Sequence, residues 1–371
     1  MSYKKTLVTA AITCIAINNL AFASYVASNS QNVSDSPQER VQIFEGSQYG
    51  FHYPTGIAID ANGDAWVTNE GNRITKIPAA DPLHPSVYSG PEYNFSRPGH
   101  PTLDAARNLW VSNTNNTVTK IPIDTPIYPT SYHGSEFNFN YPGGIAVDAK
   151  GDAWVVNQGA NGFKHFHVTK IPANYPQTAP IIYEGSKFLL NSELYDVTTD
   201  VNGNAWVTSG YGKAVIKIPA NYPKEKPVSY PIPVRFPVAI TIDTKGNVWI
   251  VGELGASDDS NMVVKLPADN PKKPVVFSDE KYKFYDPNAI TSDAEGNIWV
   301  ANGRTSSATG RGNSVTKIPA DHPENPIVYD DPRFKFNYPV GIAVDKKGNV
   351  WIANAMGNSV TNIIVDSSNM K

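Results

Sequence analysis

The chain has 371 residues and a net charge of −3, and 40% of its residues are hydrophobic. This near balance of charge excludes a bulk electrostatic attraction to nucleic acid or to an acidic membrane surface. The 30 prolines and 27 glycines indicate many turns, as a chain of short strands requires.

The first residues have the layout of a secretory signal peptide. Lys4 and Lys5 form a short positive region, an apolar stretch follows, and residues 21–23 (Ala-Phe-Ala) fit a cleavage site before Ser24. We therefore predict a signal peptide over residues 1–23 and export to the periplasm or the medium, with an uncleaved N-terminal anchor as the alternative. After cleavage, the sequence predicts no membrane span.

The predicted signal peptide contains Cys14, the single cysteine of the chain. We therefore expect a mature protein without disulfides, thiol nucleophiles or cysteine-bound metals. Residues 24–40 are rich in Ser, Asn and Gln and have no hydrophobic periodicity, which predicts a disordered leader.

From residue 41 onward the chain repeats one unit seven times. Each copy contains one tryptophan, and successive tryptophans lie 43 to 52 residues apart: Trp66, Trp110, Trp154, Trp206, Trp249, Trp299 and Trp351. This period is typical of β-propeller blades.

A turn aspartate precedes the tryptophan in every copy: Asp60, Asp104, Asp148, Asp200, Asp243, Asp293 and Asp345. Glycine stands three residues after this aspartate in six copies, and Arg107 takes its place in the second. Aspartate accepts backbone N–H groups in such turns, and glycine supplies the positive φ that closes them. Alternating apolar residues on both sides of the turn predict two strands. Segments such as 168–172 and 180–183 predict a third and a fourth.

Four strands in each copy predict an all-β fold, a seven-bladed β-propeller of four-stranded antiparallel blades over residues 41–371. The seventh copy ends after its third strand, whereas residues 41–51 match the fourth strands of other copies. We therefore expect the N-terminal strand to join the C-terminal blade and close the ring, which hides open sheet edges. The tryptophans then pack between blades. The recurring lysines, one in each of six copies, are interpreted as solvated.

The segment 341–363, GIAVDKKGNVWIANAMGNSVTNI, resembles NHL-type propeller repeats. Over about residues 41–365, the repeats resemble in particular those of the streptogramin (virginiamycin B) lyase-like family, which also has seven such blades. The resemblance implies a site near the axis, where these lyases use a histidine, glutamates and a magnesium ion. The tryptophan strand of lyase blades commonly ends in Glu, whereas five copies here have Asn: Asn69, Asn113, Asn157, Asn302 and Asn354.

Two candidate site residues depart from their equivalents in the other copies. Four residues before the turn aspartate, five copies have Gly or Ala, but the second has His100 and the fourth has Asp196. The backbone is expected to run close to the axis there, so we interpret His100 as a candidate catalytic acid/base and Asp196 as a candidate ligand or metal contact. The alternative is that each side chain fills space and bonds to a neighbouring loop.

The loops after the second strand supply further candidates. They are long in copies three, five and six, and they contain Glu253, Arg304 and Arg311, while Glu70 follows the second strand of copy one. We predict that these residues form a ligand-binding rim, with plain solvated loops as the alternative. Glu70 and Glu253, with Asp196, are also the candidate ligands of a divalent metal such as Mg²⁺.

Two histidines, His165 and His167, share one strand face, but zinc needs three or four ligands, so an ordinary surface pair is the favoured interpretation.

The sequence supports two classes of function. The favoured one is an exported, monomeric, non-catalytic propeller that binds a protein, peptide, carbohydrate or other small molecule at its channel face, with no role for nucleic acid. The alternative is a metal-dependent lyase or lactonase that acts on a macrocyclic ester, with His100 as acid/base. A purely structural role in the cell envelope is a third possibility.

Overall fold

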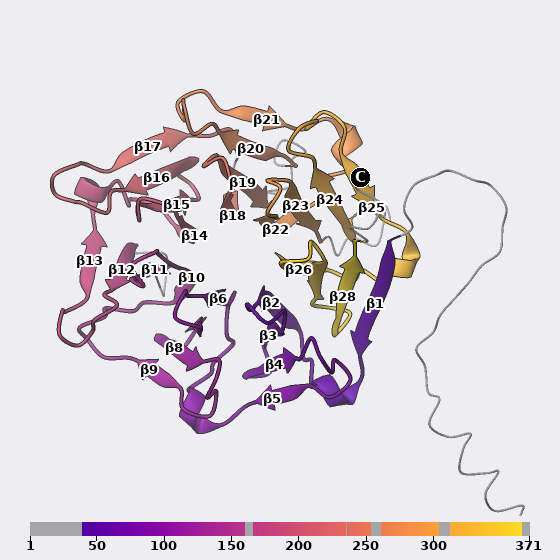
Figure 1. Ribbon diagram of the computed structural model, residues 1–371. Helices are drawn as coiled ribbons and strands as arrows, with labels where there is room; N and C mark the ends of the chain where they lie inside the picture. Colours follow the sequence, from indigo (N-terminus) through magenta and orange to yellow (C-terminus); the bar gives the residue numbers. More distant parts are fainter. Residues whose placement is uncertain (1–38, 160–165, 235, 254–260, 304–311, 366–371) are drawn as a thin grey trace, which may run out of the picture. The chain divides into compact units, whose positions relative to one another are not determined.

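The computed structural model describes residues 39–159, 166–234, 236–253, 261–303 and 312–365. These residues form seven separate four-stranded antiparallel sheets, arranged as blades around a ring (Figure 1). The predicted seven-bladed β-propeller is therefore confirmed.

In six blades the four strands follow one another in chain order from the centre of the ring to its outer wall. Blades 1 and 2 comprise β2 (Pro54–Ile59), β3 (Ala65–Asn69), β4 (Arg73–Ile77), β5 (Ser86–Tyr88), β6 (Thr102–Leu103), β7 (Asn108–Asn113), β8 (Thr117–Pro122) and β9 (Thr130–Tyr132). Blades 3 and 4 comprise β10 (Pro142–Val147), β11 (Ala153–Asn157), β12 (His167–Ile171), β13 (Ile181–Glu184), β14 (Leu194–Thr199), β15 (Ala205–Ser209), β16 (Ala214–Ile218) and β17 (Val228–Pro231). Blades 5 and 6 comprise β18 (Phe236–Ile242), β19 (Val248–Glu253), β20 (Val263–Leu266), β21 (Val275–Phe277), β22 (Pro287–Ser292), β23 (Ile298–Asn302), β24 (Ser314–Ile318) and β25 (Ile327–Tyr329).

Blade 7 combines the two ends of the propeller. It comprises β26 (Pro339–Val344), β27 (Val350–Asn354), β28 (Ser359–Ile364) and, as its outer strand, β1 (Arg40–Glu45). β1 pairs antiparallel with β28 from Arg40 opposite Ile364 to Glu45 opposite Ser359. The prediction that the N-terminal strand closes the ring is confirmed, although β1 begins at Arg40, one residue before the boundary predicted from the sequence.

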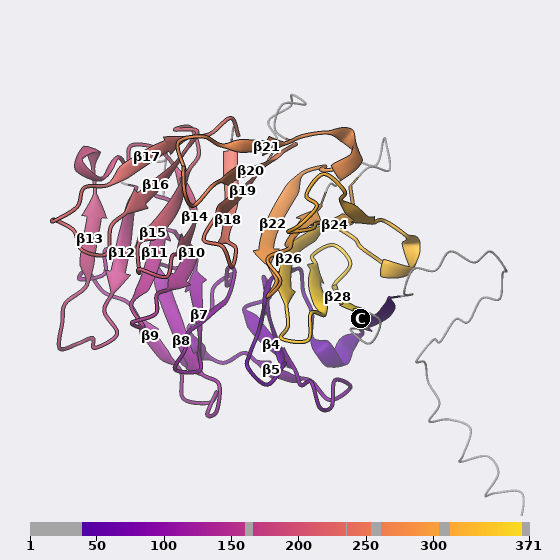
Figure 2. The ribbon, with the colours of Figure 1, turned by 45° about the horizontal axis from the view of Figure 1, so that its top comes forward.

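Short 3-10 turns lead the chain from the outer strand of one blade to the inner strand of the next. Five are η1 (Ser47–Tyr49), η2 (Pro91–Tyr93), η3 (Ser186–Phe188), η5 (Glu280–Tyr282) and η6 (Pro332–Phe334). Each buries one aromatic ring. The strands run between two faces of the ring (Figure 2). We call the face that carries the turns between first and second strands the turn face. The loop face is the other, where first strands begin and second strands end.

The core lies between the blades. Seven buried hydrophobic clusters each join two consecutive blades. For example, Trp154 of blade 3 packs with Leu194 and Val207 of blade 4, while Tyr183 stacks on its indole with ring centroids 5.3 Å apart. The prediction that the tryptophans pack between blades is confirmed.

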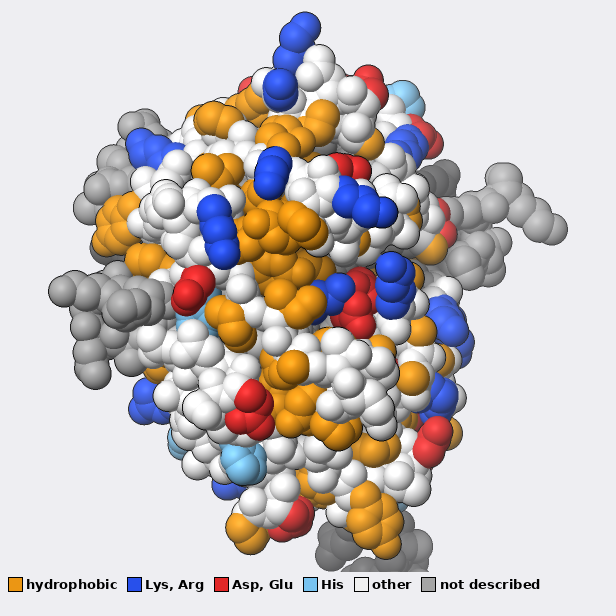
Figure 3. Space-filling view, turned by 90° about the vertical axis from the view of Figure 1, so that its left-hand side faces the viewer, with side chains coloured by type: hydrophobic (Ala, Val, Ile, Leu, Met, Phe, Trp, Pro, Cys, Tyr) orange, Lys and Arg blue, Asp and Glu red, His pale blue; other side chains and the backbone are white. Residues whose placement is uncertain are grey.

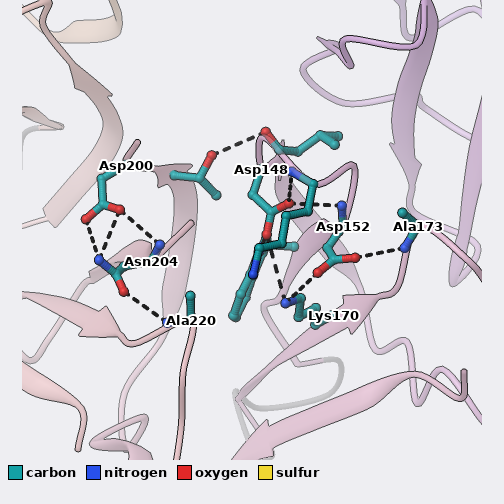
Figure 4. Close-up of polar contacts among 11 residues, drawn as sticks. Asp148, Asp152, Lys170, Ala173, Asp200, Asn204 and Ala220 are labelled. Carbon is teal, nitrogen blue, oxygen red and sulfur yellow. Dashed lines mark hydrogen bonds and ion pairs between the residues drawn. The ribbon is translucent and has the colours of Figure 1, made fainter. Parts of the chain in front are cut away.

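The turn aspartates tie each blade together on the turn face. In every blade, one carboxylate oxygen of the turn aspartate accepts the indole N–H of the tryptophan, at 2.8 to 3.4 Å. The other oxygen accepts a backbone N–H four residues on, as Asp148 does from Asp152 at 3.1 Å. Asp152 in turn accepts the backbone N–H of Ala173 at 2.8 Å (Figure 4). The predicted turns are present, and the bond to tryptophan is an addition that the sequence analysis did not predict.

The recurring lysines are not the solvated side chains that we predicted. Their Nζ atoms lie 4.7 to 5.3 Å from the tryptophan ring centroids: Lys76, Lys120, Lys170, Lys217, Lys265 and Lys317. Lysine and tryptophan face each other across the second and third strands, as Lys170 and Trp154 do, so the lysine stem covers the ring. Lys170 is only 9% exposed and pairs with Asp152 at 2.7 Å.

The outer wall of the ring exposes some hydrophobic surface among lysines and arginines (Figure 3). Outer strands contribute exposed apolar side chains, such as Ile181 at 43% and Val228 at 37%. Outer strands β5, β9, β21 and β25 have only three residues each, and such short edges limit pairing with another chain.

Candidate functional site

The inner strands approach one another closely around the axis. A Cβ atom on Gly341 would lie 2.9 Å from the Cα of Gly56, and one on Gly56 would lie 3.0 Å from the Cα of His100. One on Gly144 would lie 2.6 Å from the Cα of Asp196. Five of these seven equivalent positions therefore hold Gly or Ala because space is short, and His100 and Asp196 are the two polar exceptions.

His100 lies just before β6, and its ring makes no hydrogen bond with any described residue. The side chain is exposed to solvent, although the protein packed around it lowers the pKa of His100 by desolvation. At neutral pH the imidazole is therefore uncharged, with one ring nitrogen able to accept a proton or a hydrogen bond.

Asp196 of β14 links two blades. One carboxylate oxygen accepts the N–H of Val197 at 2.9 Å, and the other accepts the N–H of Ile240 in blade 5 at 3.1 Å. Burial raises the pKa of Asp196 to about 6, although these two hydrogen bonds act in the opposite direction. The side chain thus bonds to a neighbouring segment, as the alternative interpretation predicted, and it remains partly open to solvent.

The remaining candidates lie on the loop face or outside the described residues. Glu70 follows β3, is half-buried, and donates its backbone N–H to the carbonyl of Tyr53 at 3.2 Å. Burial, and then the charge of Glu70, raise the pKa of Tyr53. Glu253 ends β19 at the equivalent point of blade 5, opposite Phe236 of β18. Arg304 and Arg311 lie outside the described residues, as do most residues of the three long loops.

The described residues contain no assembled metal centre. Among them, no group of three or more His, Asp or Glu side chains is placed to hold an ion. Both oxygens of Asp196 already accept backbone N–H groups, and His100 has no carboxylate partner in the described part of the chain. A magnesium site that combines Asp196, Glu70 and Glu253 therefore stays a prediction from the sequence.

His167 is a structural residue and not part of the surface pair that we predicted. It is 1% exposed in β12, and its Nε2 lies 2.6 Å from the carbonyl oxygen of Asn138. The imidazole therefore bonds to the connection that precedes β10 and does not lie at the surface. His165 lies outside the described residues.

The five asparagines that stand where lyase blades have Glu are enclosed by the fold. All five are 0% exposed. In blade 3, Asn157 accepts the N–H of Asn140 at 3.0 Å and donates to Thr169 Oγ1 at 3.1 Å. A glutamate has no N–H to donate, so the amide suits this position.

Blade 4 has a cluster at the loop face that the sequence analysis missed. The hydroxyl of Tyr195 donates to Glu193 Oε2 at 2.7 Å, and Glu193 is only 7% exposed. A signal was present in the sequence, because Leu194 replaces a proline that stands at the equivalent position of every other blade: Pro54, Pro98, Pro142, Pro237, Pro287 and Pro339.

These features define the class of protein: a seven-bladed β-propeller whose polar departures from the repeat gather where the inner strands begin. No protein-family model matches the chain, and no curated protein matches its sequence. No helix among the described residues is long and apolar enough to cross a bilayer.

Solved structures show which propellers it is similar to. A streptogramin B lyase aligns with a TM-score of 0.67 at 19% identity, over 88% of this chain and 97% of that chain. A catalytically inactive virginiamycin B lyase from Staphylococcus aureus with quinupristin aligns with a TM-score of 0.69 at 18% identity, over 88% and 100%. The extracellular domain of a B. thetaiotaomicron protein assigned as a hybrid two-component system gives 0.63 at 13% identity, over 88% and 41%. In fold, the chain is a streptogramin-lyase-like propeller.

Proposed function

We propose that this protein is an exported, non-catalytic propeller that binds a small molecule, peptide or protein at the loop-face mouth of its channel. The observation that carries the proposal is the difference between the two faces. The turn face repeats one hydrogen-bond network in all seven blades. At the loop face, by contrast, His100, Glu193 and Asp196 each depart from their equivalents.

At several of these mouth positions the backbone, and not the side chain, makes the hydrogen bond that joins neighbouring segments. The N–H of Glu70 donates to the carbonyl of Tyr53, and the N–H of Gly210 donates to that of Glu193 in the same way. Because the same bond forms whichever side chain is present, the fold leaves these side chains free to vary. Binding sites are usually formed by variable side chains that a rigid scaffold holds in place.

A screen across several classes of compound tests for binding at this mouth. Thermal melts of the full chain against a library of amines, peptides, saccharides and nucleotides should reveal a compound that raises the melting temperature, since a ligand of the folded state stabilises it. The shift should vanish in a His100→Ala/Asp196→Asn variant and persist in Lys346→Ala, an exposed turn-face control. The proposal fails if no compound shifts the melt, or if only the control variant loses the shift.

Export rests on the predicted signal peptide, and extracellular propellers of similar fold support it. N-terminal sequencing of protein recovered from the periplasm or medium should give Ser24 as the first residue. Recovery of the intact N-terminus from the membrane fraction would instead support the uncleaved anchor.

The second candidate is a lyase or lactonase acting on a cyclic ester. It is favoured by the fold shared with streptogramin lyases and by the uncharged imidazole of His100, which has no hydrogen-bond partner among the described residues and suits a general base. Incubation with quinupristin, with and without Mg²⁺, followed by chromatography and mass spectrometry, separates the two candidates. We expect no ring opening. Turnover that is lost in His100→Ala would replace the binding proposal by the enzymatic one.

A further inference from the structure

We infer that the blade-4 side of the channel mouth binds an ammonium group, through the carboxylates of Glu193 and Asp196 and the aromatic ring of Tyr211. This inference rests on the proposed function, because it names the chemistry of the ligand at the same mouth. Glu193, Tyr195 and Tyr211 were not among the candidates drawn from the sequence.

The first argument is that blade 4 departs from the repeat over a whole segment. At the start of their inner strands, the other blades read Tyr-Pro-Thr-Gly, Tyr-Pro-Gly-Gly or a similar sequence with proline in second place. Blade 4 reads Glu-Leu-Tyr-Asp over residues 193–196. Two carboxylates and a phenol thus fall within four residues, where the other blades have proline and five of the six also have glycine or alanine.

The second argument is that neither carboxylate has a positively charged partner in the described part of the chain. Glu193 is 7% exposed, and its carboxylate accepts one hydrogen bond, from the hydroxyl of Tyr195, which leaves Oε1 without a partner among the described residues. Asp196 is bonded to two backbone N–H groups, and no described lysine or arginine pairs with it. Glu193 in particular is held away from water, which is unfavourable for a carboxylate unless a cation compensates its charge. An ammonium group on the ligand supplies that charge.

The third argument is that neighbouring glycines make room for these side chains. A Cβ on Gly144 would lie 2.4 Å from Asp196 Oδ1, and one on Gly210 would lie 2.6 Å from the ring of Tyr195. The surrounding structure therefore accommodates both side chains. Gly144 of blade 3 leaves room for Asp196, and Gly210, directly after β15, leaves room for Tyr195.

The fourth argument is an exposed aromatic ring in the loop whose backbone bonds to that of Glu193. Tyr211 is 69% exposed and meets Phe236 edge-on, with ring centroids 5.3 Å apart. Its neighbour Gly210 is bonded to the carbonyl of Glu193 at 2.7 Å, so the ring belongs to the same corner of the mouth. Aromatic faces attract cations, and this favours ammonium over a neutral hydroxyl group as the ligand's contact.

Two model ligands that differ in charge test the inference. Calorimetric titration of the full chain with Nα-acetyl-lysine methylamide and with its neutral analogue Nα-acetyl-norleucine methylamide should show binding of the lysine compound only. Glu193→Gln and Asp196→Asn should each weaken that binding about tenfold, since each removes one of the two carboxylate charges assigned to the ammonium group. Tyr211→Ala should weaken it several-fold. Glu92→Gln, an exposed residue of η2, serves as the matched control and should bind as the wild type does.

The outcomes separate this inference from the proposed function. Equal binding of the two compounds, no binding of the lysine compound, or undiminished binding by Glu193→Gln with a wild-type unfolding curve would overturn the ammonium site. A neutral or anionic library compound that binds the wild type but not His100→Ala/Asp196→Asn would preserve the proposed function while also overturning the ammonium site. If no compound of any class binds, both fail.

Discussion

At the scale of single residues, the same aspartate–tryptophan pair is stabilised in two ways. In blades 1 and 3 the residue four positions after the turn aspartate is also an aspartate, and a lysine pairs with it at 2.7 Å. In blade 5 that residue is Asn247, which donates to Asp243 at 2.8 Å. In blades 1 and 3 the positive charge of the lysine compensates the neighbouring carboxylates. In blade 5 the asparagine amide donates a hydrogen bond to the turn aspartate instead, so the charge of the lysine is not needed there.

This difference predicts unequal effects of one substitution in two blades. Lys170→Met leaves Asp148 and Asp152 without their cation, so we expect a loss of about 3 kcal/mol in the free energy of unfolding. Lys265→Met removes only the contact with Trp249, so we expect a loss of about 1 kcal/mol or less. Urea unfolding of both variants measures the two losses, and equal losses would contradict this account of the lysines.

Asp196 predicts a specific dependence of stability on pH. Its pKa is raised from 3.8 to about 6 in the folded protein, so the folded state holds a proton that the unfolded state releases. Stability from this group therefore falls as pH rises from about 4 to about 6 and stays lower above that range. Relative to Asp196→Asn, the wild type should lose about 1 kcal/mol over this interval, a modest figure because water reaches the carboxylate. A constant difference between the two proteins from acid to neutral pH would refute the assignment.

At the scale of elements, the turn between the first and second strands has glycine as its fourth residue in six of the seven blades. Gly151 has a φ of +85°, and a Cβ there would lie 3.2 Å from the Cβ of Ala173. Gly348 has a φ of +82°, and no atom lies within 4 Å of its added Cβ. The two positions thus share one backbone conformation but differ in available space.

Alanine at these two glycines should separate backbone strain from crowding. Gly348→Ala should lower the free energy of unfolding by about 1 kcal/mol, from the left-handed conformation alone. Gly151→Ala should lower it further, because Ala173 must also move. Chemical denaturation measures both variants, and a larger loss at Gly348 would show that crowding is not the added factor.

The elements were largely predictable from the sequence because their signals are local. The period of the tryptophans, the turn aspartates and the apolar alternation specify strands and blade number independently of packing. The prediction for the lysines was wrong because their burial depends on which residue each lysine faces on the neighbouring strand. Trp154 faces Lys170 in this way, and such a pairing depends on the strand register. The site was only half predictable. His100 and Asp196 departed from the repeat visibly, whereas the importance of Glu193 emerged from its burial and from its bond to Tyr195.

At the scale of the whole molecule, stability depends on joining the two ends of the propeller. Phe44 of β1 is 3% exposed and stacks on Trp351 of blade 7, with ring centroids 5.4 Å apart. It belongs to the cluster that also contains Ile57 and Val67 of blade 1. Phe44, near the start of the propeller, thus helps to stabilise the contact between its last and first blades.

Phe44→Ala should therefore lower the free energy of unfolding by about 3–5 kcal/mol, as for other large buried aromatic residues. Val87→Ala, on an outer strand at 39% exposure, is the control and should cost less than about 1 kcal/mol. Urea unfolding monitored by tryptophan fluorescence gives both values. A loss at Phe44 no larger than that at Val87 would show that β1 contributes little to closure.

The central claim is that the loop-face mouth is kept for binding and not for the fold, and stability measurements test it most directly. The account predicts that Glu70→Gln, His100→Ala and Glu193→Gln each change the free energy of unfolding by less than about 0.5 kcal/mol. Asp148→Asn on the turn face should lose about 2 kcal/mol, because it breaks a buried hydrogen-bond network. If the mouth variants lose as much stability as Asp148→Asn, the mouth residues belong to the scaffold and the account is contradicted.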